Sequence, residues 1–234
     1  MKIALLGYGK MGKVIESIAL NRGHEISLKV DKDTKDYDLS SVDVAIDFST
    51  PKSAVDNIRK ALESKVPVIS GTTGWLSELE DIKTLCKEKK GAFIYASNFS
   101  IGVNIFFELN KSLAKMINNL TDYNIDLEEI HHIHKLDIPS GTAITLAEDV
   151  IENSNYDSWQ LAPSDDPKKL DINAKRQDNV CGTHKVNYNS INDQISLTHI
   201  AHNREGFGLG AVIAAEWIIG KKGVFTMNDI LNLK

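Results

Sequence analysis

Short apolar runs alternate with amphipathic stretches over the first hundred residues of the chain. Five runs have the length and composition of buried strands: 3–6, 25–30, 42–48, 66–70 and 92–96. The stretches between most of them carry apolar residues at the spacing of one helical face, which predicts helices at about 11–22, 51–64 and 75–89. Strands that alternate with helices in this way predict a doubly wound parallel sheet.

The pattern changes after residue 100. Two long helices are predicted, at 101–119 and 204–221, and a shorter one follows Thr142. Four further segments are predicted to be extended: 123–134, 174–177, 185–188 and 194–200. The polar stretch 153–169, which contains two prolines, is expected to be a loop or lid. This half therefore predicts an α+β arrangement with an antiparallel or mixed sheet.

A glycine turn follows the first predicted strand. Residues 7–12 read Gly-Tyr-Gly-Lys-Met-Gly, and Asp31 ends the next strand 19 residues after Gly12. Strand, glycines, helix, strand and acid in that order are typical of a dinucleotide site, where the acid binds the adenosine ribose. Lys32 could hold a ribose 2′-phosphate or be a solvated surface lysine. The choice between NADH and NADPH is therefore open, and both can be used.

Small and polar residues also follow the later strands. Residues 71–74 read Gly-Thr-Thr-Gly, and residues 97–100 read Ser-Asn-Phe-Ser. Ligands of open parallel sheets bind at the carboxyl ends of strands, so both segments are expected near the nucleotide. The alternative for 71–74 is a tight turn without a ligand.

The stretch 131–142 concentrates the chemistry of the second half. Three histidines and Lys135 lie within residues 131–135, Pro139 interrupts regular structure, and Ser140-Gly141-Thr142 opens a helix. We call residues 140–142 the anion cradle, because a helix N-terminus offers backbone N–H donors to an anion. Ser140 could instead be an N-cap and nothing more.

A metal site is the other interpretation of the three histidines. If 131–135 is extended, His131 and Lys135 face one way while His132 and His134 face the other. That geometry separates the potential ligands, so no metal site is predicted. It also places a proton donor and a cation together, which suits a small acidic substrate.

Composition narrows the class of function. A net charge of −5 and a pI near 5.8 argue against nucleic acid or a membrane surface as a partner. The 234 residues contain no apolar run of membrane-spanning length and no secretory signal pattern, and the two cysteines are far apart. These features predict a cytoplasmic enzyme.

Four segments together resemble the dihydrodipicolinate reductase family: 7–12, 71–74, 96–104 and, most specifically, 131–142. They occur in the family's order over essentially the whole chain. The resemblance implies an NAD(P)H-dependent oxidoreductase that reduces 4-hydroxy-tetrahydrodipicolinate in lysine and diaminopimelate biosynthesis. It implies a proton donor at His131, and at Lys135 a second catalytic group, which is both a proton donor and a partner for a substrate carboxylate.

The resemblance also implies binding residues. Those for the substrate's carboxylates are His132, Ser140, Gly141 and Thr142. Those lining the cofactor are Gly7, Tyr8, Gly9, Lys10, Met11, Gly12, Asp31, Lys32, Gly71, Thr72, Thr73, Ala96, Ser97, Asn98 and Phe99. Lys10 stands where the family often has arginine and Asp31 where it often has glutamate, which bears on cofactor preference.

The expected fold is α/β, a Rossmann-type nucleotide domain (1–100 and 208–234) plus an α+β substrate and oligomerisation domain with a mixed sheet (101–207). The family implies a homotetramer. Arg204 could be a further anion contact or a surface ion pair. Two rival functions are another dinucleotide dehydrogenase, such as one acting on a semialdehyde, and a non-catalytic NAD(H)-binding sensor. The sensor does not explain His131, Lys135 and the anion cradle together.

Overall fold

The computed structural model describes residues 1–34, 36–120, 122–163 and 165–233. The chain forms two compact units. Unit 1 comprises residues 1–101 and 204–234, and unit 2 comprises residues 102–203. The roles assigned above to the two halves remain predictions.

Unit 1 is built on a six-stranded parallel sheet in the order β2-β1-β3-β4-β5-β11. Its strands are β1 (Lys2–Leu6), β2 (Glu25–Val30), β3 (Val44–Asp47), β4 (Val68–Ser70), β5 (Ala92–Tyr95) and β11 (Gly223–Phe225). The order reverses at β1, because β2 pairs on one side of β1 and β3 on the other. In open parallel sheets, nucleotides bind at the carboxyl ends of the strands beside such a switch point.

Helices cover both faces of this sheet. Buried residues of α1 (Lys10–Asn21), α6 (Glu205–Ile218) and α7 (Met227–Leu231) pack in one hydrophobic cluster. Those of α2 (Pro51–Glu63) and α3 (Leu79–Glu88), which follows the short 3-10 helix η1 (Leu76–Glu78), pack in a second. The strands contribute to both clusters, which explains why they read as continuous apolar runs. The predicted Rossmann-type domain is confirmed.

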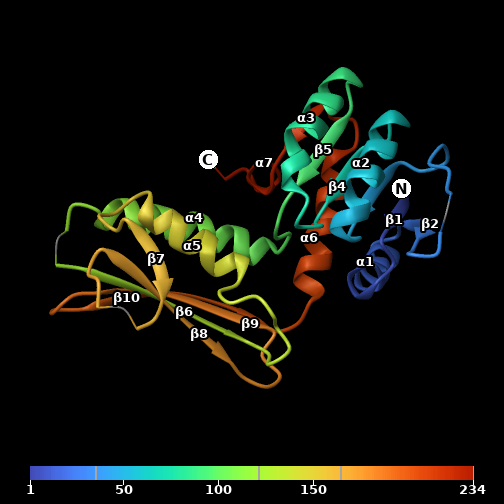
Figure 1. Cartoon of the computed structure of the whole chain (residues 1–234). Coiled ribbons are helices and arrows are strands. Elements are labelled where there is room, and N and C mark those ends of the chain that lie inside the picture. Colours follow the sequence, from blue (N-terminus) through green and yellow to red (C-terminus); the bar gives the residue numbers. More distant parts are fainter. Residues whose placement is uncertain (35, 121, 164, 234) are drawn as a thin grey trace. The chain divides into compact units, whose positions relative to one another are not determined.

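Unit 2 holds a five-stranded mixed sheet in the order β10-β9-β6-β8-β7. The strands are β6 (Asn124–His131), β7 (Ser158–Leu161), β8 (Lys169–Arg176), β9 (Gly182–Asn189) and β10 (Gln194–Ala201). Pairing is antiparallel among β10, β9 and β6, and parallel among β6, β8 and β7. The helices α4 (Ile101–Ile117) and α5 (Gly141–Ile151) lie against one face (Figure 1).

Residues of β6 alternate between the two faces of the mixed sheet. Ile125, Leu127, Glu129 and His131 are all buried, and the residues between them are partly exposed. Two apolar residues and two ionisable ones therefore share a buried face, since strand side chains repeat every second residue. This places a carboxylate and an imidazole in an apolar setting.

Three segments differ from the sequence prediction. The expected loop 153–169 contains β7, a four-residue edge strand that pairs with β8. The C-terminal β11 and α7 have only three and five residues, too few for a periodic pattern. The extended segment predicted over 123–134 ends at His131, and residues 133–134 form a turn. The assumption that residues 131–135 are extended is therefore wrong.

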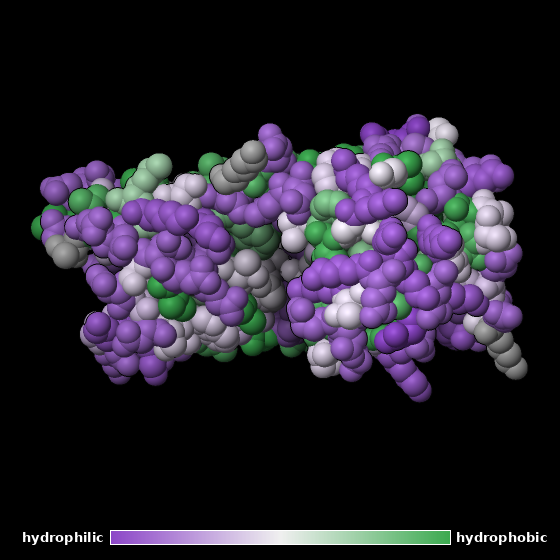
Figure 2. Space-filling model, turned by 90° about the horizontal axis from the view of Figure 1, so that it is seen from above, coloured by the Kyte–Doolittle hydropathy of each residue, from purple (hydrophilic) through white to green (hydrophobic). Residues whose placement is uncertain are grey.

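Hydrophilic residues make up most of the face shown in Figure 2, and hydrophobic ones occur there in separate small patches. Among the described residues, no helix has the length and apolarity needed to cross a membrane.

Candidate active site

The glycine turn of unit 1 is shaped by close backbone contacts. Gly7 has φ +105°, and a Cβ there would meet the Phe48 carbonyl oxygen at 2.2 Å. A Cβ on Gly12 would meet the Gly7 carbonyl oxygen at 2.4 Å, so only glycine lets α1 pack this closely on the turn. By contrast, a Cβ on Gly9, the N-cap of α1, would meet nothing within 4 Å. Open space beside a helix N-terminus fits a dinucleotide pyrophosphate.

The end of β2 lies beside this turn. The Gly7 and Tyr8 amides both donate to the Val30 carbonyl, at 2.9 and 3.0 Å. Asp31 follows and is exposed, and its Oδ1 accepts from the Asp33 amide and the Thr34 hydroxyl. These hydrogen bonds, led by that from Asp33, lower the pKa of Asp31. Asp31 is thus a fixed carboxylate next to the glycine turn, as a ribose site requires.

The other predicted cofactor residues differ in how their side chains are used. Lys10, Lys32, Thr73 and Ser97 are exposed, while Tyr8, Met11, Gly71, Ala96 and Asn98 are partly buried. The Tyr8 hydroxyl donates to Glu16 and accepts from Lys29 at 3.3 Å. Phe99 is 1% exposed and belongs to the core, so any contact it makes with a cofactor involves its backbone.

A buried carboxylate, overlooked in the sequence, joins the ends of β3 and β4. Asp47 is fully buried, and its two oxygens accept four hydrogen bonds of 2.7–3.0 Å. The donors are Ser49 Oγ, Asn57 Nδ2, Ser70 Oγ and Thr72 Oγ1. Burial raises the pKa of Asp47, and the four hydrogen bonds oppose this. Thr72, a predicted cofactor-binding residue, therefore uses its hydroxyl to fix the 71–74 turn to Asp47.

The same turn makes room for an aromatic ring. A Cβ on Gly71 would lie 2.3 Å from Cζ of Phe48, so glycine is required where the ring crosses the turn. The Phe48 and Phe99 rings are 5.8 Å apart. Phe48, Gly71 and Phe99, which follow β3, β4 and β5, therefore pack together at the carboxyl ends of these strands.

In unit 2 we call residues 131–140 the histidine loop. It begins at buried His131, and the Lys135 amide donates to the His132 carbonyl in a turn. His132 is partly buried, whereas His134 is exposed. The Lys135 ammonium contacts both carboxylate oxygens of Asp137, at 2.8 and 2.9 Å. The turn therefore leaves only His131 of the three histidines buried.

Strand register brings two unpredicted residues, Arg176 and His184, to His131, and a third, Glu129, lies two residues before it on β6. Glu129 is opposite His184 of β9, and His131 is opposite Arg176 of β8. The His131 and His184 rings meet edge to face with centroids 5.0 Å apart. Glu129 Oε2 lies 3.4 Å from His131 Nδ1 and 3.9 Å from His184 Nε2. The contacts of Arg176 and His184 follow from pairing between strands about fifty residues apart, which no local motif reveals.

Arg176 ties the strand cluster to the histidine loop. Its guanidinium donates to the carbonyls of Asp137 at 2.7 Å and Lys135 at 3.4 Å, and contacts Glu129 Oε1 at 3.4 Å. A single planar cation with several donors thus fixes both the buried acid and the loop backbone.

Ser140 connects the loop to α5. Its hydroxyl accepts from the Ala143 amide at 3.2 Å, which is the N-cap interaction, and contacts His184 Nε2 at 3.1 Å. Its backbone amide donates to the Glu129 carboxylate at 3.0 Å. Gly141 begins the helix, is exposed, and has open space around its Cβ position. The anion cradle is therefore anchored at Ser140 and open at Gly141.

Burial controls the charge of both histidines. Burial lowers the pKa of His131 to about 4, and the positive charges of Lys135 and Arg176 lower it further, whereas the negative charge of Glu129 opposes the shift. Burial lowers the pKa of His184 to about 3, and His131 adds to this effect. Both rings are therefore neutral at pH 7 before a ligand arrives.

Glu129, His131 and His184 also offer ligand atoms within 4.8 Å of one another. The Glu129 carboxylate, however, already accepts from the Ser140 amide and contacts Arg176. We therefore assign the three residues to an internal network of charged and polar groups.

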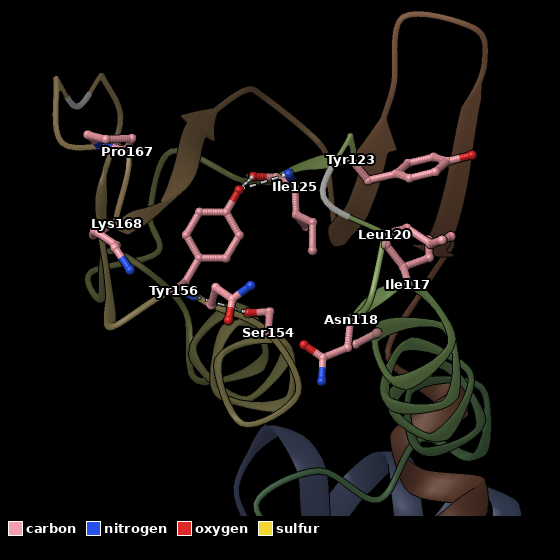
Figure 3. Close-up of a pocket in the computed structure, with 11 residues that line it drawn as sticks. Ile117, Asn118, Leu120, Tyr123, Ile125, Ser154, Tyr156, Pro167 and Lys168 are labelled. Atoms are coloured by element: carbon pink, nitrogen blue, oxygen red, sulfur yellow. Dashed lines mark hydrogen bonds between the residues drawn. The ribbon is translucent and has the colours of Figure 1, made fainter.

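A separate cavity of about 280 Å³ lies in unit 2 at the start of β6 (Figure 3). The Tyr156 hydroxyl in its wall accepts a hydrogen bond from the Ile125 backbone amide at 3.0 Å. Its lining comprises Ala114, Ile117, Asn118, Leu120, Tyr123, Ile125, Ser154, Asn155, Tyr156, Pro167 and Lys168. None of the predicted site residues is among them, and His131 is at the other end of β6. We therefore place the chemistry at the histidine loop.

Two family models match the chain in succession. The model described as "Dihydrodipicolinate reductase, N-terminus" matches residues 1–99, and that described as "Dihydrodipicolinate reductase, C-terminus" matches residues 102–231. Together they span both units.

Individual relatives agree. A 4-hydroxy-tetrahydrodipicolinate reductase of Christiangramia forsetii is 54% identical, over 99% of this chain and 98% of the relative. That of Buchnera aphidicola is 41% identical over 82% of this chain and 73% of the relative. The fold is similar to that of dipicolinate-bound dihydrodipicolinate reductase from Paenisporosarcina sp. TG-14, with a TM-score of 0.81, 22% identity, and coverage of 100% and 99% of the two chains.

Proposed function

Because this chain belongs to the dihydrodipicolinate reductase family, we propose how its histidine loop carries out the family's reaction. The enzyme is an oxidoreductase that reduces 4-hydroxy-tetrahydrodipicolinate with NADH or NADPH, in lysine and diaminopimelate biosynthesis. The assignment of individual residues to steps is our proposal. The observation that carries it is the burial of His131 beside Lys135, Arg176 and the anion cradle.

The nucleotide is proposed to bind unit 1 at the carboxyl edge of the parallel sheet. The first turn of α1 and Gly9 face its pyrophosphate, Asp31 its ribose, and the backbone of residues 71–73 and 96–99 the rest. When bound, reduced nicotinamide supplies the hydride for C4 of the unsaturated ring that remains after water loss. Lys32 and Lys10 are exposed next to this edge, and either can attract a 2′-phosphate, so the preference stays open.

Unit 2 is proposed to hold the substrate and deliver the proton. The carboxylates of the ring bind Lys135, His132 and the backbone N–H groups at Gly141 and Thr142, where the helix dipole also favours negative charge. As hydride adds, electron density moves towards the ring nitrogen, and His131 supplies the balancing proton. A placed general acid of this kind contributes about 10²–10⁴ in rate.

Loss of the Lys135 ammonium should mainly weaken substrate binding. We expect Lys135→Ala to lower kcat/KM about 10- to 100-fold, because a hydrogen bond to a charged group contributes roughly 1.5–3 kcal/mol. Lys175→Ala is the matched control, since that ammonium pairs with Glu128 on the surface of β6. Steady-state kinetics on both variants measure this. Equal effects of the two substitutions would contradict a specific role for Lys135.

Substrate binding should also draw a proton onto His131. The ligand-free pKa of about 4 leaves the ring neutral at pH 7, and nearby carboxylates favour its charged form, which raises the pKa. Binding of dipicolinate, an analogue with two carboxylates, should therefore take up a fraction of a proton that grows as the pH falls from 7 to 6. Titration calorimetry in buffers of different ionisation enthalpy measures the uptake. Zero uptake at both pH values, or equal uptake by His131→Gln, would refute this.

We further propose that the enzyme works in the cytoplasm as a homotetramer assembled through unit 2. Apolar side chains support this on β10, the edge strand of the mixed sheet, where Ile195 and Ile200 are 39% and 54% exposed. An edge strand also presents unpaired backbone N–H and C=O groups, with which a further chain can pair.

A further inference from the structure

The Glu129 carboxylate lies at the centre of the groups proposed to act in catalysis, yet it is 0% exposed. Burial of a charged carboxylate is unfavourable in free energy unless the carboxylate is paired. An acid on the apolar face of β6 is therefore not explained by packing alone. Its partners are the Ser140 amide, Arg176 and the two histidines His131 and His184. They come from the histidine loop, β8, β6 and β9, respectively.

We propose that Glu129 is a positioning residue, which orients the imidazole of His131 for proton delivery and holds the anion cradle through the Ser140 amide. This inference rests on the proposed role of His131. It adds to that role a specific carboxylate that fixes the ring and the substrate-binding helix together.

The geometry of His131 supports the orienting role. Nδ1 is buried and has no hydrogen-bond partner among the described residues, although Glu129 Oε2 lies 3.4 Å away. This gap closes readily when Nδ1 carries a proton, because a charge-assisted N–H to carboxylate bond is favourable at a slightly shorter distance. A proton on Nδ1 leaves Nε2 as the atom that exchanges a proton with substrate. Nε2 lies only 3.1 Å from the Cβ position that Gly182 leaves empty.

The charges around His131 show why the acid matters. Lys135 and Arg176 disfavour a charged imidazole, and buried neutral His184 contacts its ring. Two carboxylates oppose them, and Glu129 has a larger effect on the His131 pKa than Asp137, which is paired with Lys135. Without Glu129 the pKa of His131 should fall further, and the ring would be harder to protonate when substrate binds.

The test uses three substitutions in the full-length enzyme. Glu129→Gln keeps the size of the side chain and removes its charge, whereas Glu129→Asp keeps the charge and withdraws it by one methylene. Glu128→Gln is the matched control, because the neighbouring acid faces the other side of β6 and pairs with Lys175. Each is assayed for kcat and KM from pH 5 to 9, for proton uptake on binding dipicolinate, and for Tm.

We expect Glu129→Gln to lower kcat about 10- to 100-fold, the range found when the carboxylate partner of a metal-bound histidine is removed. Proton uptake should decrease, and the alkaline limb of the kcat profile, where His131 loses its proton, should move to lower pH. Glu129→Asp should lower kcat while proton uptake stays near wild type, and Glu128→Gln should match wild type in every readout. If Glu129→Gln does not fold, the contrast between Glu129→Asp and Glu128→Gln decides the question.

A purely structural role predicts a different result. Glu129→Gln or Glu129→Asp would then lower Tm and the folded fraction, with kcat per folded enzyme, pH profile and proton uptake unchanged, and the proposal would be overturned. His131→Gln in the same assays separates this outcome from failure of the proposed function. If His131→Gln is fully active, the role of His131 itself is wrong. If it is inactive while Glu129→Gln resembles wild type, only the positioning role fails.

Discussion

Replacing His131 by glutamine should lower kcat for reduction of 4-hydroxy-tetrahydrodipicolinate about 10²–10⁴-fold. Glutamine fills much of the same space, but its amide cannot deliver a proton near neutral pH. The residue is buried at the end of β6 in unit 2, whereas the glycine turn belongs to unit 1, so binding of NADH or NADPH should be unchanged. Stopped-flow or steady-state absorbance of the reduced nucleotide, together with nucleotide titration, measures both properties.

The matched control is His134→Gln. The same substitution is then made three residues along the histidine loop, at an exposed ring. Its activity should stay close to wild type. A comparable loss in both variants would mean that the loop tolerates no change, and would remove the evidence for a specific proton donor at His131.

Replacing Asp47 by alanine should destabilise unit 1 by about 3 kcal/mol. Four donors would lose their acceptor inside the protein, and a buried unsatisfied polar group costs roughly 1–3 kcal/mol. Burial of the charged carboxylate is itself unfavourable, as the raised pKa of Asp47 indicates. Removing that charge therefore offsets part of the destabilisation. Hydrogen exchange of the amides in β3 and β4 reports the local free energy of unfolding.

Asp38→Ala is the control for this measurement. Asp38 is exposed and accepts from its near neighbour Ser40, so its loss should change stability by only about 0.5 kcal/mol. If Asp47→Ala were as mild as Asp38→Ala, the hydrogen-bonded carboxylate would not be what holds the 71–74 turn. Nucleotide affinity, measured in parallel, shows whether that turn has moved.

The architecture was largely predictable because its signals are local. Continuous apolar runs marked the buried parallel strands, and the glycine turn predicted the first strand-to-helix connection, where Gly7 and Gly12 make backbone contacts that exclude any side chain. The elements that escaped prediction are short. β11 and β7 have three and four residues, and pairing with neighbours in the sheet, rather than sequence pattern, makes them strands.

The site was only half predictable for a related reason. The histidines, Lys135 and Ser140 lie within ten residues of one another in the sequence and could be recognised together, whereas Arg176 and His184 reach them through strand register. One signal for Glu129 was present. It stands in the alternation of Ile125 and Leu127, two residues before His131, where an acid on an apolar face indicates a buried partner.

The most direct measurement is a coupled assay with enzymatically generated 4-hydroxy-tetrahydrodipicolinate, in which the loss of NADH and of NADPH absorbance is followed separately. We expect wild-type enzyme to oxidise at least one of them, and the ratio of the two kcat/KM values gives the preference. His131→Gln should abolish most of this turnover while still binding nucleotide. Nucleotide binding by the wild type without turnover of either cofactor would contradict the reductase assignment and favour a sensor or another dehydrogenase.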